Sequence, residues 1–388
     1  MFARQVQEEL LDRGFSRRQL GRIVALAGAG ATINAALGGT AAFAQGGQAA
    51  RGIIGGVRIG ANECWTGPFA PAAAAAADVI AQGNRYDPGN ERDKLIKTVA
   101  SVEGIPAELV TTWPGSGDPL VRSVISFCSP TKGLVTMDPT YESPWRAAAW
   151  LQAPVTKVPG APGKGADVRA MLAAAPDAGL YYVCTPNNPT GAVTPLADIE
   201  WLAANKPAGS VLLVDEAYLH FTDGQSATQL AAQRNDVIVM RTFSKLFGMA
   251  GMRLGLTFSH PDIQKQMARY DGGQVTGMLP MPAVACGNAS YTQTALIKAR
   301  RDEMIATRTA TIAALANRGI AVHPGSEANM FMVDWKTRQA KDMQTALLAQ
   351  KVQIGRNWQI WPTVSRVTVG SADEMKTFLS AVDTVLKA

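Results

Sequence analysis

The sequence has few of the side chains that most often bind metals. It contains three histidines and four cysteines in 388 residues, and the cysteines lie too far apart to form the close pairs of a zinc site. The cysteines are Cys64, Cys128, Cys184 and Cys286, and the histidines are His220, His260 and His323. We therefore expect no metal site. Because nothing in the cysteine spacing requires a disulfide, we expect buried free thiols.

The sequence also lacks a strong charge imbalance. Its 37 Lys and Arg residues exceed its 31 Asp and Glu residues by six, and the basic residues are scattered without interleaved aromatic residues. This pattern argues against nucleic-acid binding. An apolar content of 47% with 18% charged residues is ordinary for a globular protein. The length is enough for a large domain and a smaller one.

The N-terminal region lacks an apolar run strong enough for a good membrane-spanning helix. Arg17 and Arg18 precede a run rich in Gly and Ala, residues 23–42, and a small-x-small cleavage pattern follows at Ala44. A short N-terminal helix or a membrane anchor is the alternative. The pattern resembles a twin-arginine export signal. It predicts a signal peptide at residues 1–44 that lies outside the fold, export to the periplasm, and no stable membrane insertion after cleavage.

A lysine follows one of the most apolar segments of the chain. Residues 237–240 are an apolar, largely β-branched run typical of a buried parallel strand, and the polar residues Thr242 and Ser244 lead to Lys245. Ligands of α/β sheets bind at the ends of such strands. A lysine held there in partly dry surroundings becomes a usable amine nucleophile. The alternative is an ordinary solvated surface lysine.

Two further predicted strands end in polar side chains. Residues 211–218 end with Asp215 and Tyr218, and residues 180–183 lead to Asn188. An amine, a carboxylate, a phenol and an amide at one sheet edge suit pyridoxal phosphate. The lysine would attach the cofactor, and the carboxylate would keep the ring nitrogen protonated so that the ring withdraws electrons. The amide and the phenol could hydrogen-bond the ring hydroxyl.

Three ordered motifs carry a family resemblance. They are NNPTG at residues 187–191, DEAY at 215–218 and S-K-x-F-x-x-x-G-x-R at 244–253. With them, the chain from about Arg58 onward resembles the fold-type-I pyridoxal-phosphate aminotransferases, and most closely the histidinol-phosphate aminotransferase branch. The resemblance implies a three-layer α/β large domain of the aspartate-aminotransferase type, with a mainly parallel mixed sheet. A smaller α+β C-terminal domain is implied as well.

The pattern of elements predicts where these domains lie. Residues 62–288 alternate strands and helices, whereas residues 289–388 combine a long helical region with short strands around a helix at 341–350. We therefore expect the large domain at 62–288 and the small domain at 289–388. Residues 45–61 are expected to form an N-terminal arm that packs on the small domain.

The resemblance assigns two groups of residues to the cofactor phosphate. Small residues at a helix N-terminus leave backbone N–H groups free for a phosphate, and an arginine can grip it with two hydrogen bonds. The expected phosphate-binding residues are Ser116, Gly117 and Asp118, the last through its backbone amide, together with Thr242, Ser244 and Arg253. Plain turns, caps and a solvated arginine are the alternatives.

Two tyrosines complete the expected cofactor site. Tyr141 follows a predicted strand and corresponds to the aromatic residue that stacks on the pyridine ring in the family. Tyr86 corresponds to a tyrosine that reaches across a homodimer to the cofactor phosphate of the partner. Without the resemblance, Tyr86 would be interpreted as a turn residue packed on its own helix.

Substrate-binding residues are expected at both ends of the catalytic region. Asn62 and Glu63 resemble the family segment at the mouth of the active site. Arg366 lies where the family has the arginine that binds the substrate α-carboxylate, although an arginine there could simply guard an edge strand. Arg356 is expected near the distal group of the substrate. The family tyrosine that helps to hold a substrate phosphate is missing from residues 47–57, which weakens the case for a phosphorylated substrate.

The sequence therefore predicts an exported, homodimeric pyridoxal-phosphate aminotransferase that acts on amino acids and 2-oxo acids. Lys245 is the expected attachment point and general base. A decarboxylase or lyase of the same fold type is the nearest alternative, because these enzymes share the cofactor-binding residues. A non-catalytic exported binding protein on this fold is the alternative of another class. The presence of Lys245, Asp215 and Arg253 argues against it.

Overall fold

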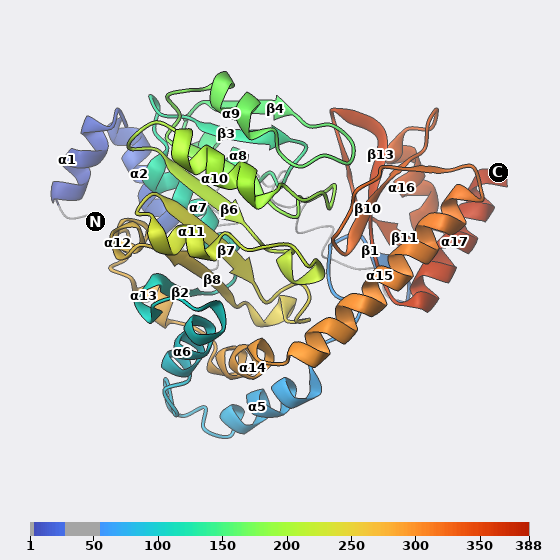
Figure 1. Ribbon diagram of the computed structural model, residues 1–388, viewed down its shortest axis with the longest axis horizontal. Helices are drawn as coiled ribbons and strands as arrows, with labels where there is room; N and C mark the ends of the chain where they lie inside the picture. The colour runs from blue at the N-terminus through green and yellow to red at the C-terminus, as the bar shows by residue number, and fades with distance from the viewer. Residues whose placement is uncertain (1–3, 28–54, 388) are drawn as a thin grey trace.

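The large domain is built on a seven-stranded sheet, on the left of Figure 1, and the smaller C-terminal domain lies on the right. The structure, a computed structural model, describes residues 4–27 and 55–387. In spatial order the strands of the large sheet are β2 (Val110–Trp113), β8 (Gly255–Ser259), β7 (Val237–Thr242), β6 (Val211–Asp215), β5 (Leu180–Cys184), β3 (Leu134–Asp138) and β4 (Val155–Pro159). The neighbouring pairs are parallel except for the two that β8 makes with β2 and β7. The predicted mixed, mainly parallel sheet is confirmed.

Alternate residues of the central strands face opposite sides of this sheet. In β5, Tyr181 and Val183 pack in one hydrophobic core, whereas Leu180 and Tyr182 pack in another. The first core is covered by α9 (Val168–Ala174), α10 (Leu196–Asn205) and α11 (Thr228–Gln233), and the second by α7 (Gly117–Phe127), α8 (Ser143–Trp150) and α12 (Pro261–Ala268). The sheet therefore lies between two layers of helices, as predicted.

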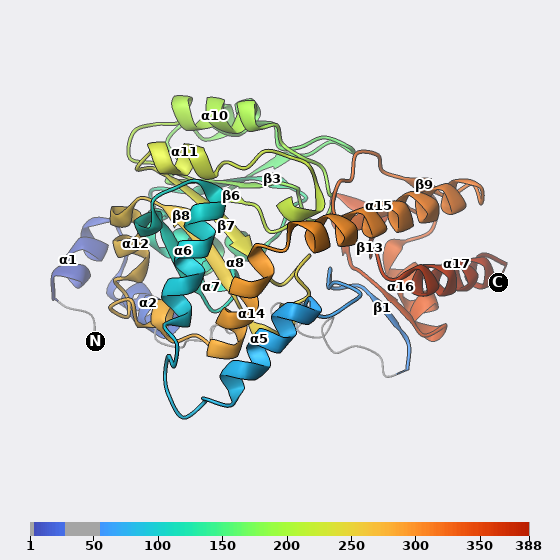
Figure 2. The same ribbon diagram turned by 60° about the horizontal axis from the view of Figure 1, so that its bottom comes forward.

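The C-terminal domain has its own antiparallel sheet. Its strands are, in spatial order, β12 (Asn357–Trp358), β13 (Trp361–Thr368), β10 (Met330–Asp334) and β9 (Ala321–Val322), and its helices are α15 (Thr294–Ala316), α16 (Ala340–Ala349) and α17 (Ala372–Lys387). Helix α15 runs from the large domain to the small one (Figures 1 and 2). The arm is described from residue 55 onward, and its strand β1 (Val57–Ile59) pairs in parallel with β11 (Val352–Ile354).

The large domain extends slightly farther along the chain than the boundary that the sequence predicts. The expected boundary at residues 288/289 falls inside α14 (Met281–Tyr291), which packs on α5 (Ala70–Ile80) and α6 (Glu91–Glu103), as Figure 2 shows. A side chain at Gly287 would overlap Leu254, so this helix lies directly against the large domain. The first part of α15 still contacts the large domain, because Arg300 donates to the backbone carbonyl of Leu246 at 2.8 Å.

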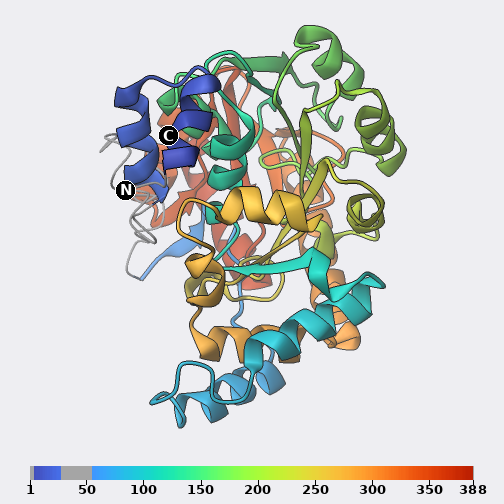
Figure 3. The ribbon, with the colours of Figure 1, turned by 90° about the vertical axis from the view of Figure 1, so that its left-hand side faces the viewer.

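Part of the expected signal peptide packs on the catalytic fold. Helices α1 (Arg4–Asp12) and α2 (Arg17–Ala27) lie at the end of the large domain farthest from the small domain (Figures 1 and 3). Leu10, Phe15 and Ile23 are at most 2% exposed and belong to the core that contains α7 and α8. The structure thus differs from the expectation that residues 1–44 lie outside the fold. The physical reason is that α1 and α2 present apolar side chains to the large domain. The predicted cleavage site at Ala44 lies outside the described residues.

The four cysteines are free thiols, and Cys64 alone among them is only half-buried. Within residues 4–27 and 55–387, no group of histidine, cysteine and acidic side chains is arranged to hold a metal ion. No helix in these two stretches combines the length and apolar character of a membrane span.

Candidate active site

Parallel strand ends bring the predicted catalytic residues to one edge of the large sheet. Residue Asp215 at the end of β6 lies beside Cys184 on one neighbouring strand and Met240 on the other. The loop after β7 then places Lys245 so that its Nζ donates a hydrogen bond to the backbone carbonyl of Asn62, at 3.1 Å. This edge is where ligands of parallel α/β sheets bind.

Lys245 lies in surroundings that favour its neutral form. Burial, reinforced by repulsion from the Arg366 guanidinium, lowers the pKa of Lys245 to about 8. The ammonium also lies 5.5 Å from the centre of the Tyr218 ring. About a tenth of the amine is therefore unprotonated at pH 7, far more than for a free lysine, and a nucleophile or general base requires this neutral form.

Asp215 is held by two hydrogen bonds in a dry environment. Its Oδ1 accepts from the backbone N–H of Ala217 at 3.1 Å, and its Oδ2 accepts from the Tyr182 hydroxyl at 2.9 Å. Burial raises the pKa of Asp215 to about 6, although both hydrogen bonds oppose that rise. Sequence reasoning missed Tyr182. The period of two along β5 places Tyr182 and Cys184 on the same face, but linking Tyr182 to Asp215 also requires the strand register, in which Cys184 pairs with Asp215.

A second set of contacts links the arm to both domains. The side-chain amide of Asn62 donates to the Tyr218 hydroxyl at 3.0 Å, and its carbonyl oxygen accepts from the Thr368 hydroxyl at 2.8 Å. Asn62, which was predicted to bind substrate, lies beside Lys245 and the expected ring-binding phenol of Tyr218. Its backbone φ of 53° is left-handed, a conformation that asparagine tolerates better than most residues.

Arg366 and Asn188 meet where the α-carboxylate is expected. One guanidinium nitrogen, Nη1, donates to the Asn188 side-chain oxygen at 2.9 Å, and Nη2 donates to the backbone carbonyl of Gly60. Among the described residues, Nε of Arg366 is buried without a hydrogen-bond partner. A buried unpaired donor is costly, so this atom suits an anionic ligand. Burial lowers the pKa of Arg366 to about 10, which still leaves it charged at neutral pH.

The predicted phosphate-binding residues form a cradle at the N-terminus of α7. Gly115 has a φ of 85°, and a side chain there would overlap the Arg253 guanidinium, so the arginine lies directly on this backbone. Arg253 also donates to the Ser244 hydroxyl at 3.3 Å, and Thr242 donates to the same hydroxyl at 2.9 Å. Ser116 precedes the helix without a side-chain cap.

The cradle suits a phosphate. The first N–H groups of an α-helix have no partner within the helix, and the helix dipole favours an anion there. The first two helical residues are Gly117 and Asp118. The Asp118 carboxylate pairs with Arg122 at 2.6 Å, so the side chain of Asp118 is directed to an arginine.

Four other predicted residues have partly or fully exposed side chains, in contrast to this buried cluster. Tyr86 is fully exposed between α5 and α6, and Tyr141 is 39% exposed after β3. Glu63 pairs with Arg58 at 3.4 Å. The fourth, Arg356, pairs with Glu142 of the large domain, at 2.9 Å between Nη1 and Oε2.

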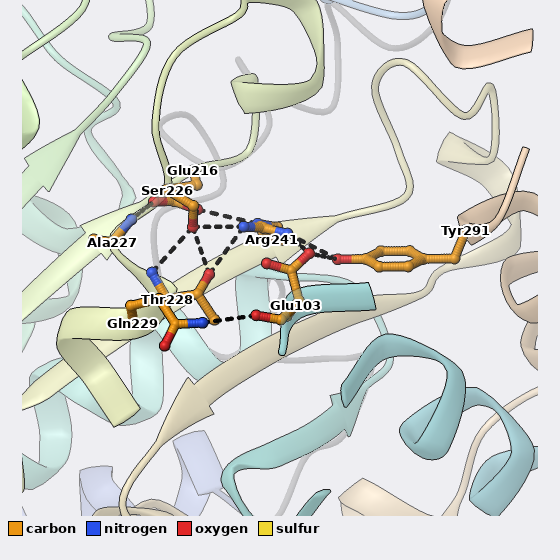
Figure 4. A network of polar contacts seen from close by, with 8 residues as sticks. All are labelled: Glu103, Glu216, Ser226, Ala227, Thr228, Gln229, Arg241 and Tyr291. Atoms are coloured by element: carbon orange, nitrogen blue, oxygen red, sulfur yellow. Dashed lines mark hydrogen bonds and ion pairs between the residues drawn. The ribbon is translucent and has the colours of Figure 1, made fainter. Parts of the chain in front are cut away.

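A buried polar network, drawn in Figure 4, supports the strand ends from behind. Arg241, next to Thr242 on β7, donates to Glu216, which follows Asp215. The other acceptors of its guanidinium are Glu103, Tyr291, Ser226 and Thr228. All five N–H groups of the guanidinium are thus satisfied. Sequence reasoning missed this network, because its members come from distant segments.

The arrangement fits pyridoxal phosphate. The cradle would hold the phosphate, Lys245 would attach the cofactor, and Asp215 would pair with the ring nitrogen. When bound, the cofactor withdraws electrons from the substrate Cα. Lys245 would then take a proton from that carbon and return it, and Arg366 would hold the substrate anion.

Comparisons with known proteins agree with this site. The family described as aminotransferase class I and II matches residues 55–382. The chain is 31% identical to a histidinol-phosphate aminotransferase of Symbiobacterium thermophilum, over 85% of this chain and 90% of that protein. It is 30% identical to an aromatic amino acid aminotransferase of Rhodococcus erythropolis, over 86% of this chain and 91% of that protein.

The fold is also that of a solved aminotransferase. The histidinol-phosphate aminotransferase of Sinorhizobium meliloti, solved in complex with pyridoxal-5'-phosphate, has a TM-score of 0.78 and 24% identity, covering 89% of this chain and 94% of that one. This likeness confirms the predicted fold. The match of the family model to residues 55–382 shows that the chain belongs to the class I and II aminotransferase family.

Proposed function

We propose that this protein is a pyridoxal-phosphate aminotransferase that moves the amino group of an α-amino acid to a 2-oxo acid. The observation that carries the proposal is the position of Lys245. Its amine has a pKa lowered to about 8 and lies at the same sheet edge as Asp215, close to the arginine that has an unpaired buried Nε. A general base and an anion-binding group thus face the same space.

The roles of the remaining residues follow from their contacts. Tyr218 and Asn188 would bind the ring hydroxyl, and Tyr141 would stack on the ring from the mouth of the site. Arg366 would hold the α-carboxylate of every donor, since its Nε lacks a protein partner. We therefore expect Arg366→Ala to lower kcat/KM for all donors alike.

The donor that we propose is an α-amino acid rather than a phosphate ester. The curated relatives include enzymes named for histidinol phosphate and for aromatic amino acids, so the family alone leaves both open. The chain lacks the upstream tyrosine that helps to hold a substrate phosphate. Arg356, the other cation near this end of the site, is already paired with a carboxylate.

We also propose a homodimer in which Tyr86 contacts the cofactor phosphate of the partner. Tyr86 is fully exposed, and it lies close in the chain to Ile80, which is 65% exposed. Met278, just before α14, is 73% exposed. Apolar side chains exposed around α5 and α14 are consistent with a surface that a second copy covers.

Export remains a proposal that the twin-arginine pattern supports. Arg17 and Arg18 are exposed at the start of α2, where a receptor could contact them. We expect replacement of both by lysine to keep the protein in the cytoplasm without changing its fold, because the signal is an address. Cell fractionation checks this, and unchanged export of the double variant would contradict it.

The central experiment follows the cofactor absorbance while single amino donors are added to the purified protein. Transamination converts the bound cofactor to its amine form and releases the matching 2-oxo acid without loss of CO₂. A decarboxylase would instead release CO₂. Borohydride reduction followed by peptide mapping should place the cofactor on Lys245. A label on another lysine, or no conversion with any donor, would overturn the proposal.

A further inference from the structure

Two arginines are neighbours in the backbone at the substrate end of the site. The backbone N–H of Arg366 donates to the carbonyl of Arg356 at 3.3 Å, so the two residues are direct neighbours across the turn between β12 and β13. The indole of Trp358 lies near both side chains. The guanidinium carbon Cζ of Arg356 is 4.6 Å from the centre of this ring, and that of Arg366 is 5.8 Å from it. Proximity of Arg356 adds to burial in lowering the pKa of Arg366. A substrate anion would therefore meet two positive charges here.

A carboxylate from the other domain neutralises one of these charges. Glu142 follows Tyr141 and immediately precedes α8, and its Oε2 accepts from Arg356 at 2.9 Å and from Arg146 at 3.1 Å. The Glu142 side chain is 18% exposed and that of Arg356 is 38% exposed. The ion pair thus joins the large domain to the small domain, starting from the residue next to the expected ring-stacking tyrosine.

The charge left at this end of the site decides which anion fits. With Glu142 in place, the Arg356 guanidinium already has a carboxylate partner, so Arg366 is the arginine of this pair that is left to hold the α-carboxylate of a substrate. A phosphate monoester carries about 1.5 to 2 negative charges at pH 7 and needs more positive charge. By holding Arg356, Glu142 withdraws the second guanidinium that a phosphate ester would need. Specificity often depends on such an element that disfavours the competing ligand.

We propose that Glu142 determines donor specificity by occupying Arg356, so that the enzyme favours donors with an α-carboxylate over donors with a phosphate ester in that position. This inference rests on the proposed aminotransferase function. Glu142 acts through Arg356 and is not expected to touch the reacting atoms. It is thus a specificity residue, which no motif in the sequence indicates.

The test compares kcat/KM for histidinol phosphate and for phenylalanine, each with the same 2-oxo acid. Glu142→Gln keeps the shape of the side chain and removes its charge. We expect the ratio of histidinol phosphate to phenylalanine to rise by about tenfold, because Arg356 is released to pair with the phosphate. Glu142→Asp retains the charge and should move the ratio much less. Cofactor absorbance and melting temperature establish that both variants are folded.

A double-mutant cycle separates this mechanism from a general charge effect. In the Arg356→Gln background, Glu142→Gln should leave the ratio unchanged, because the residue through which it acts is gone. No rise in the single variant, or the same rise in both backgrounds, would overturn the inference while leaving the aminotransferase function intact. A wild-type enzyme that transaminates no donor would overturn the proposed function, and the specificity inference with it.

Discussion

At the scale of single residues, the chemistry of the site depends on burial and on neighbouring charges. Lys245 is the clearest case, since burial and the Arg366 charge both lower its pKa, to about 8. A protonated amine is not a nucleophile, so the reactive fraction grows as the pH rises through this value. We predict that covalent capture of pyridoxal phosphate by the apoenzyme accelerates with a midpoint near pH 8, rather than near the roughly 10.4 of free lysine.

Stopped-flow absorbance of apoenzyme mixed with cofactor over a pH series measures this midpoint. Arg366→Gln removes one cause of the shift and should move the midpoint upward. A midpoint near 10 in the wild-type protein would show that the lysine is solvated in solution.

Tyr182 provides a second prediction at this scale. Its hydrogen bond favours the ionised form of Asp215, and hydrogen bonds to charged groups contribute about 1.5–3 kcal/mol. Tyr182→Phe should therefore raise the pKa of Asp215. A protonated Asp215 cannot act as an anion toward the ring nitrogen, so activity would be lost at a higher pH as the solution is acidified. We expect the acid limb of the kcat/KM profile to move up by roughly one pH unit.

The neighbouring tyrosine offers a matched control. Tyr181 is equally buried, but its hydroxyl donates to the backbone carbonyl of Ala175 on the other side of the sheet. Tyr181→Phe should lower stability without moving the acid limb. Equal shifts in the two variants would mean that packing, and not the contact with Asp215, sets the profile.

The sequence could predict a site residue only where a local pattern determines the position of that residue in the fold. Lys245, Asp215 and Asn188 come directly after apolar strands, so the strand pattern alone brings them together. Tyr182 lies inside a strand, and its role depends on which residue of the next strand lies beside it. Glu142 depends on a contact between two domains. Neither the strand register nor the domain contact is encoded in a local pattern.

At the scale of elements, the close approach of two loops makes the phosphate cradle. Gly115 has a positive φ, and a side chain there would overlap the Arg253 guanidinium. We predict that Gly115→Ala displaces Arg253 and weakens cofactor binding at least about tenfold, because a charged hydrogen bond contributes about 1.5–3 kcal/mol. Gly251→Ala, in the same loop region as Arg253 but with open space around it, should bind almost normally. Cofactor titration of both apoenzymes compares them.

The N-terminal helices lead to a prediction about stability. Phe15 is 2% exposed in the core shared with α7, whereas Leu11 on α1 is 38% exposed. In the full-length chain, Phe15→Ala should lower the free energy of unfolding by about 3 kcal/mol, as truncation of a buried aromatic residue does. Leu11→Ala should cost much less. Denaturant unfolding measures both, and equal small effects would show that these helices do not stay docked in solution.

The sequence patterns predicted the helices and strands inside the large domain better than the segments at which the domain begins and ends. Helix α6 matches its predicted range of 91–103, because Gly104 ends it in the left-handed conformation. The N-terminal segment has the charge and composition of an export signal, yet residues 4–27 pack on the fold. The composition of a segment indicates which class of segment it resembles. It does not indicate whether another part of the chain offers an apolar surface on which that segment can pack.

At the scale of the whole molecule, the proposed dimer would make each active site from two chains. Lys245 and Asp215 lie together within one chain, while Tyr86 is fully exposed and does not join them. If Tyr86 serves the partner, a dimer of one Lys245→Ala chain and one Tyr86→Ala chain has one site with both changes and one site with neither. Random pairing makes about half of the dimers mixed, so about one quarter of the wild-type activity should return.

Coexpression of the two variants in equal amounts, assayed at limiting cofactor, tests this arrangement. Lys245→Ala alone should be inactive, and Tyr86→Ala alone should bind cofactor weakly. If Tyr86 acted within its own chain, each site of a mixed dimer would carry one change. The activity of the mixture would then be the average of the activities of the two single variants. Lys245→Ala with Asp215→Ala is the control for pairing. Because these two residues belong to the same site of the same chain, their mixed dimer has no intact site and should recover no activity.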